Sequence, residues 1–248
     1  MPLPKRITPD NIIDAAVEIK YLSNLPFEVL IGIFFNAFDE TYRYTSRPLQ
    51  PNLPFLPFNP ALSIAFSTSS QPVFYNDHFS IRLLSNSIIF GCLNNKYIGW
   101  ESYKTEIEKV LRTLAGTGHI TTWIRIGIRY ISEYLKKDLK EFTKFDFTFG
   151  LPEVQSLSTT FRSEFGYKDA KVVLNLNNMV PTIRQQSVGN TAELVETSII
   201  DVDVIKDPLA INEVTELMDA INATHDLEKE LFFNLLTEKF LTTLNPIY

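Results

Sequence analysis

Two short patterns contain the side chains of this sequence that could do chemistry. Asp201 and Asp203 flank Val202, so on a strand both carboxylates lie on one face. Arg125 and Arg129 are spaced so that they also share a strand face. A D-x-D pair can hold a divalent cation through its carboxylate oxygens. Two guanidinium groups on one face can grip a phosphate or a carboxylate.

Three interpretations of these side chains stay open. The one we expect is that Arg125 and Arg129 pair with Asp201 and Asp203 across neighbouring strands. A second is that the two arginines, with Trp123 between solvent and core, form a surface that binds an anion or a partner. A third is a metal or anion active site on the two aspartates, although the sequence shows no third metal ligand at a recognisable spacing from them.

The sequence offers no set of residues that would act as nucleophile and base. His78, His119 and His225 lie far apart and show no metal-binding spacing. Cys92 follows Phe90-Gly91 in a predicted strand and is expected to be a small core residue. No serine lies in a G-x-S-x-G elbow. These observations favour a non-enzymatic protein without a cofactor.

The composition restricts the class of protein. The chain has 248 residues, of which 45% are hydrophobic and 21% charged, so it is neither disordered nor collagen-like. Its single cysteine excludes an intramolecular disulfide. The N-terminus carries no secretory signal, and the most apolar run, Val29 to Phe38, is shorter than the roughly 20 residues of a membrane span. We therefore expect a cytoplasmic protein that does not bind a membrane.

Charge is unevenly placed along the chain. The net charge is −6, which disfavours nucleic acid as a partner. Acids dominate from Thr191 to Glu230, whereas bases outnumber acids from Arg125 to Lys144. These segments are either solvated faces that neutralise each other in the fold, or an acidic face for a basic partner.

Hydrophobic periodicity predicts an α+β fold. In the first half it predicts strands at residues 13–21, 62–66, 73–75, 79–84 and 87–93 and helices at 27–38 and 100–114. In the second half it predicts strands at residues 120–134, 145–149, 157–165, 171–176 and 193–205. Residues 209–245 contain neither glycine nor proline, and they predict one long C-terminal helix or a helix pair.

Each half thus has several antiparallel strands and closes with a helix. We therefore predict two similarly built subdomains, 1–118 and 119–248, each an antiparallel sheet with packed helices. The boundary falls at the Gly116-Thr117-Gly118-His119 turn.

A proline repeat occupies residues 48–60. Its prolines recur every third residue and would line one edge of a polyproline II rod. The segment is either a strap across the fold or a ligand for an aromatic groove of a partner. The residues that would carry such a contact are Pro48, Pro51, Pro54, Phe55, Pro57 and Phe58.

Three segments together are similar to one known family: Ile12–Ile19, Tyr97–Tyr103 and the R-I-G-I-R-Y run that starts at Arg125. With the Asp201-Val202-Asp203 strand and an acidic C-terminal helix, the chain resembles a sporadically distributed prokaryotic family of proteins of about this length, to which no function is assigned. The family usually has Asn where Ser132 stands. The resemblance implies no catalytic residues, and the patchy distribution suggests accessory loci such as anti-phage defence or toxin–antitoxin systems.

The function predicted from the sequence is that of a non-enzymatic interaction subunit or regulator. Its partner would be another protein encoded at the same locus or a second copy of the chain. One alternative is a metal-assisted phosphoryl enzyme or nucleotide-binding protein that uses Asp201 and Asp203. Another is a chaperone-like module that holds a client against the proline segment.

Overall fold

The computed structural model describes residues 3–38, 42–46, 72–93, 97–145, 158–185 and 192–248. The predicted strand at 62–66, most of the one at 145–149 and the proline segment at 48–60 lie outside these ranges. No helix among the described residues combines the length and the apolar character that crossing a membrane requires.

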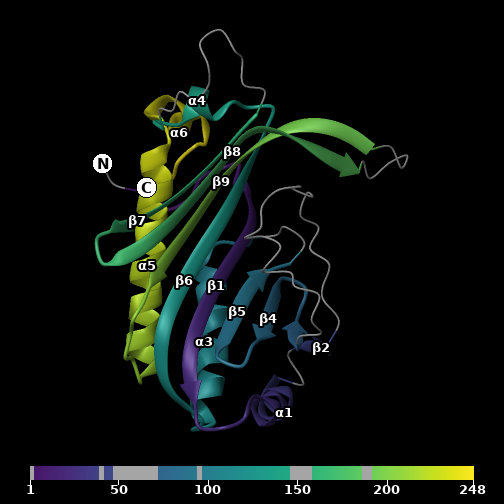
Figure 1. Cartoon of the computed structure of the whole chain (residues 1–248), viewed down its shortest axis with the longest axis vertical. Helices are drawn as coiled ribbons and strands as arrows, with labels where there is room; N and C mark the ends of the chain where they lie inside the picture. Colours follow the sequence, from purple (N-terminus) through teal and green to yellow (C-terminus); the bar gives the residue numbers. More distant parts are fainter. Residues whose placement is uncertain (1–2, 39–41, 47–71, 94–96, 146–157, 186–191) are drawn as a thin grey trace.

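One antiparallel sheet of nine strands forms the centre of the protein (Figure 1). Its strands follow the order β2-β3-β4-β5-β1-β6-β9-β8-β7. Their bounds are β1 Ile12–Ser23, β2 Arg43–Thr45, β3 Val73–Tyr75, β4 Phe79–Leu83, β5 Ser87–Cys92, β6 Ile120–Leu135, β7 Thr159–Tyr167, β8 Ala170–Gln185 and β9 Ala192–Lys206. The α+β class expected from the sequence is confirmed.

The expectation of two separate sheets is wrong. Strand β1 pairs with β6 along almost its whole length, from Ile12 opposite Ser132 to Ser23 opposite Ile120. The strands of both halves therefore belong to a single sheet. Alternating hydrophobicity identified each strand, but it does not identify a partner that lies about a hundred residues away along the chain.

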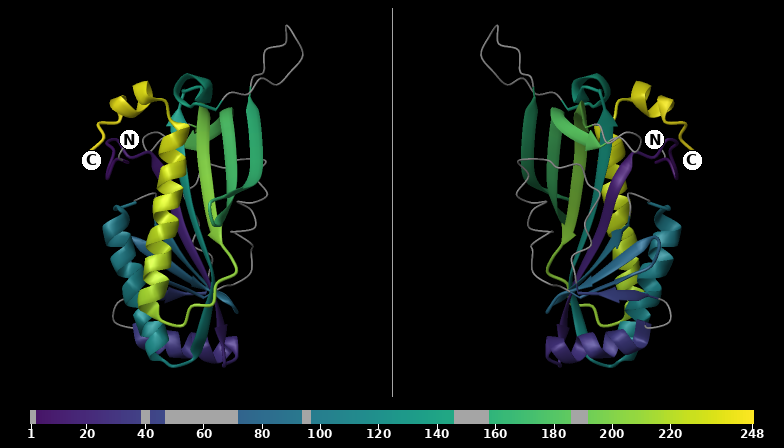
Figure 2. Two further views of the ribbon diagram at one scale, coloured as in Figure 1. Left: turned by 90° about the vertical axis from the view of Figure 1, so that its left-hand side faces the viewer. Right: turned by 90° about the vertical axis from the view of Figure 1, so that its right-hand side faces the viewer.

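The helices cover one face of this sheet (Figure 2). Their bounds are α1 Phe27–Phe38, α3 Trp100–Gly116, α4 Leu139–Phe142, α5 Val214–Leu235 and α6 Glu238–Thr243. Helix α5 packs on β6 and β9 and also contacts α3. The predicted C-terminal helical region is thus one long helix, α5, followed by the short α6, whose first turn is capped by Thr237.

Two apolar clusters fill the space between sheet and helices. The first joins α1, α3 and the first part of α5 to β1, β4, β5 and β6, and it contains Phe34, Ile107 and Ile221. The second joins the last part of α5 to β8 and β9, and it contains Leu227 and Val202. Because α5 packs on both β6 and β9 and contributes to both clusters, it connects them.

This architecture predicts that the two halves do not fold alone. A fragment of residues 119–248 loses the strand that pairs with β6, and a fragment of 1–118 loses the strand that pairs with β1. We expect each fragment to lack a cooperative unfolding transition, because the exposed strand and the bared apolar face of α5 or α3 have no partner. Circular dichroism during denaturant titration measures this. A cooperative transition in either isolated fragment would restore the two-domain interpretation.

Candidate functional site

The structure brings together only part of the set predicted from the sequence. Arg129 donates to Asp201 through two bonds, Nε to Oδ1 and Nη2 to Oδ2, each 2.7 Å long. Asn175 donates to Asp201 Oδ2 at 2.8 Å. The expected cross-strand pairing is therefore confirmed for Arg129 and Asp201. The side chain of Asp201 is 3% exposed, and both of its oxygens accept hydrogen bonds. Arg129 and Asp201 therefore form a structural ion pair within the sheet.

The other predicted residues lie elsewhere. Arg125 pairs with Glu18 of β1, so its expected pairing with the aspartates of β9 is wrong. Trp123 is buried in the first apolar cluster, edge-on to Tyr21, and is not on a surface. Asp203 lies opposite Arg129 in the β6–β9 register, and burial raises its pKa to about 6. Within the described ranges, no three His, Cys, Asp or Glu side chains gather as a metal ion would require.

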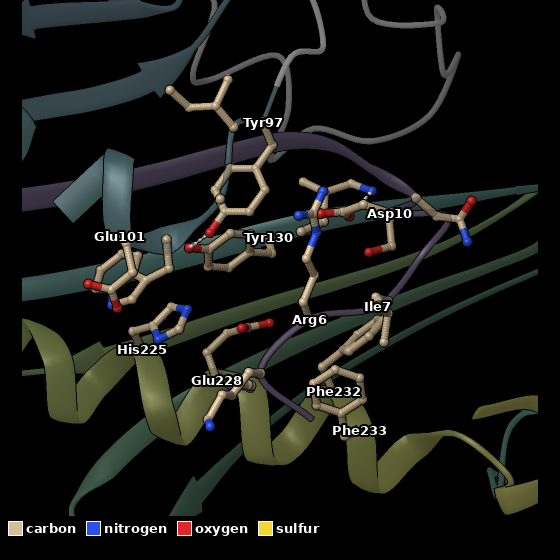
Figure 3. Close-up of a pocket in the computed structure, with 18 of the residues that line it drawn as sticks. Arg6, Ile7, Asp10, Tyr97, Glu101, Tyr130, His225, Glu228, Phe232 and Phe233 are labelled. Carbon is tan, nitrogen blue, oxygen red and sulfur yellow. Dashed lines mark hydrogen bonds between the residues drawn. The ribbon is translucent and has the colours of Figure 1, made fainter. Parts of the chain in front are cut away.

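A pocket of about 710 Å³ forms a different site, on the helix-covered side of β6 (Figure 3). Its walls come from four parts of the chain: the segment before β1, the start of α3, the second half of β6 and the second half of α5. The lining includes Lys5, Arg6, Ile7, Asp10, Tyr97, Gly99, Trp100, Glu101, Ser102, Lys104, Tyr130, Ser132, Tyr134, Asn222, His225, Asp226, Glu228, Lys229, Phe232 and Phe233.

The N-terminal wall of the pocket is held by residues near the C-terminus. Ile247 forms a backbone bridge with Arg6, in which its carbonyl accepts from Lys5 N at 2.6 Å and its amide donates to Arg6 O at 2.8 Å. Asn245 also donates its side-chain amide to Thr8 O at 2.9 Å. The segment that carries Lys5, Arg6 and Asp10 to the pocket is therefore held by the C-terminal residues.

Aromatic rings form much of the remaining wall. The hydroxyl groups of Tyr97 and Tyr130 are 3.1 Å apart and hydrogen-bonded. Trp100, the first residue of α3, stacks on His225 of α5 with ring centroids 3.8 Å apart and planes 4° from parallel. This stack fixes the start of α3 against the middle of α5. Flat rings beside polar groups are typical of pockets for small organic molecules.

Two buried titratable side chains lie one helical turn apart on α5. Glu228 is 4% exposed and its Oε1 has no hydrogen-bond partner among the described residues. Burial raises the pKa of Glu228 to about 8, so its carboxyl group is largely protonated at neutral pH. Burial, helped by Lys229 and Lys104, lowers the pKa of His225 to about 3, so its imidazole is neutral.

A ring nitrogen of His225 also lacks a hydrogen-bond partner within the described ranges. Its Nδ1 makes no hydrogen bond in the described part of the chain, and the nearest carboxylate, that of Asp226, lies 3.6 Å away. A neutral acid and a neutral imidazole thus face the pocket with hydrogen-bonding capacity to spare. Such buried groups are costly to leave without partners.

Reasoning from the sequence missed this pair. His225 was considered only as one of three isolated histidines, and Glu228 was not singled out. The signal that would have found them is spacing: Ile221, His225, Glu228 and Phe232 follow one another at steps of four, three and four. They therefore continue the buried stripe of the helix. A polar residue on such a stripe is expected to be buried.

Comparison with known proteins adds no family: no family model and no curated protein matches this chain. The R-I-G-I-R-Y run that carries the resemblance occupies the centre of β6, and its Tyr130 reaches the pocket. Family membership stays a prediction.

The opposite pKa shifts of Glu228 and His225 predict a change in stability with pH. The folded state holds the Glu228 proton between pH 4.5 and 8, where the unfolded chain releases it, so stability falls as pH rises through this range. His225 acts in the opposite sense, and its contribution is lost as pH falls from 6.5 to 3. Glu228→Gln should therefore gain stability over the natural chain as pH rises, by about 4 kcal/mol near pH 8.

Urea unfolding of both chains between pH 5 and 8.5 measures this difference. Glu216→Gln, at an exposed position of the same helix, is the matched control and should follow the natural chain at every pH. Parallel curves for Glu228→Gln and the natural chain would mean that Glu228 is ionised in the fold.

Proposed function

We propose that this protein is a non-enzymatic regulator that binds a small organic molecule in the pocket between α3, α5, β6 and the N-terminal segment. The observation that carries the proposal is the Glu228 carboxyl group, 4% exposed and with a free oxygen, in a pocket of about 710 Å³. Buried polar groups are satisfied by protein, water or ligand. Within the described chain, protein supplies no partner for this oxygen.

Other features of the pocket favour binding over catalysis. A volume of about 710 Å³ is within the range of pockets that hold small ligands. An imidazole whose pKa is about 3 is a weak base at neutral pH, and burial raises the pKa of Tyr97 and Tyr130 above their ordinary value. His225 is therefore a poor proton acceptor, and the two tyrosines are poor proton donors. The proposal includes the cytoplasmic location expected from the sequence.

Blocking the pocket tests this function. Asn222 lines the pocket, whereas Ala223, the next residue of α5, is exposed and does not. We expect molecules that bind the natural chain in a ligand-observed NMR screen to lose their signal with Asn222→Trp and to keep it with Ala223→Trp. The screen contradicts the proposal if its hits bind the two variants equally, or if it yields no hits.

A second observation supports the protein-interaction role. Beyond the bulge between Asn177 and Val180, the last residues of β8 pair only with the first residues of β9, and the two strands curve away from the sheet as an arm (Figure 1). On this arm Ile183 and Leu194 lie opposite each other and are 64% and 68% exposed. A two-stranded ribbon is marginally stable alone. An exposed apolar pair at its end is typical of a surface that another protein covers.

Substitution on the arm tests the interaction. Ile183→Asp with Leu194→Asp should abolish a complex with proteins encoded at the same locus, or a dimer of the chain, because two charges enter an apolar contact. Light scattering after size-exclusion chromatography of co-expressed proteins measures it. Leu22→Asp, at another exposed apolar position, is the control. The role is rejected if the natural chain elutes alone as a monomer beside its co-expressed neighbours.

A further inference from the structure

We infer that the ligand of this pocket is a small organic acid, bound with its carboxylate at the first turn of α3 and with a polar atom of its body at Glu228. The inference rests on the proposed ligand-binding function and adds the charge of the ligand. Three features of the pocket support it. They are backbone amides that have no acceptor within helix α3, a buried hydrogen-bond donor, and a lining with more basic than acidic side chains.

The first turn of α3 supplies amides without partners in the helix. Gly99 is the N-cap, with φ +94°, and no side chain caps this turn. The first helical bond is that of Tyr103 N to Gly99 O, at 3.1 Å, so the preceding amides have no acceptor within the helix. Trp100, Glu101 and Ser102 of this turn line the pocket. Amides at a helix N-terminus are a ready site for an anion.

Glu228 adds a donor on the neighbouring wall. Its side chain points into the pocket, and its Oε1 has no partner among the described residues (Figure 3). The Trp100–His225 stack connects the two walls, since Glu228 follows His225 by one turn of α5. Side chains so spaced have Cβ atoms roughly 5–6 Å apart. A molecule the size of an aromatic acid can therefore contact both the amides of α3 and the acid proton of Glu228.

The charges around the pocket favour an anion over a cation. Four bases line it, Lys5, Arg6, Lys104 and Lys229, against three acids besides Glu228, namely Asp10, Glu101 and Asp226. Glu101 pairs with Lys104 at 2.8 Å, so these two charges offset each other. Asp226 is mostly exposed, and Asp10 accepts from the amide of Ile12 at 3.0 Å. Three bases remain against two acids, and a helix N-terminus adds further positive potential.

A set of three probes with one body separates the charge of the ligand from its shape. Benzoate, benzamide and benzamidine carry a negative, zero and positive charge on the same ring. Each probe is to be titrated to millimolar concentration into the full chain, and the chemical shifts of the backbone amides are to be followed by NMR. Benzoate should bind about tenfold more tightly than benzamide and shift the signals of Gly99 to Ser102, because its carboxylate accepts from those amides.

The other outcomes overturn different statements. Stronger binding of benzamidine would make the pocket a cation site, and equal binding of benzamide and benzoate would remove the role of charge; both leave the ligand-binding function standing. No binding of any probe, together with an empty screen, would remove that function and this inference with it.

Variants of Glu228 test its part. The probe here is 4-hydroxybenzoate, whose ring hydroxyl group can accept from a neutral donor at position 228. Glu228→Gln keeps such a donor and should hold this probe within about threefold of the natural chain, whereas Glu228→Leu should weaken it about tenfold. Glu216→Gln, an exposed change on the same helix, is the control and should leave binding unchanged. If Glu228→Leu binds 4-hydroxybenzoate as the natural chain does, Glu228 does not contact the ligand.

Discussion

The pairing of β1 with β6 is the contact on which the rest of the structure depends. It merges the strands of the two halves into one sheet, and the Glu18–Arg125 ion pair lies across it. It also brings the segment before β1 beside Ser132 and Tyr134 of β6, where that segment forms a wall of the pocket. The hydroxyl group of Tyr103 donates to Ala15 O at 3.3 Å, which holds α3 on the same junction. Three of the four walls of the pocket are therefore set by one strand pair.

The fourth wall, α5, explains why a pocket exists at this place. Its first part packs in one apolar cluster and its last part in the other, with Ile221 and Leu227 on either side of the gap. His225 and Glu228 lie where the helix passes from one cluster to the other. Side chains from the sheet do not fill this position, so the polar pair faces a hollow instead of a partner. The second half of α5 thus stabilises the fold through its apolar residues and forms the pocket through its polar ones.

Much of the fold could be predicted from local patterns, because periodicity and turns are local. The helix at Trp100–Gly116 and the hairpin of β7 and β8 were expected from spacing alone. The course of β8 beyond Leu176 was not expected, since Asn177, Asn178 and Pro181 interrupt the apolar alternation, and pairing with β9 supplies the order there. The β1–β6 pair and the Arg125–Glu18 contact were missed, because a local sequence pattern does not identify which distant residue a side chain will contact. Glu228 and His225 could have been found from their place on the buried stripe of α5, but neither belongs to a recognisable motif, so neither was singled out.

Burial in the pocket disfavours the charged form of both an acid, Glu228, and a base, His225. Burial keeps the proton on Glu228 and keeps one off His225, so a single physical cause, the loss of water around the ionised form, makes an acid and a base neutral together. The charged side chains of Lys5, Arg6 and Asp10 are exposed, and they lie on the segment held by the C-terminal residues. Helix α3 is the exception, because its amides bring positive potential to the pocket wall without carrying an ion. A charged ligand can therefore be recognised at the start of α3, while the hydrogen bonds of its uncharged part are made to Glu228 and His225.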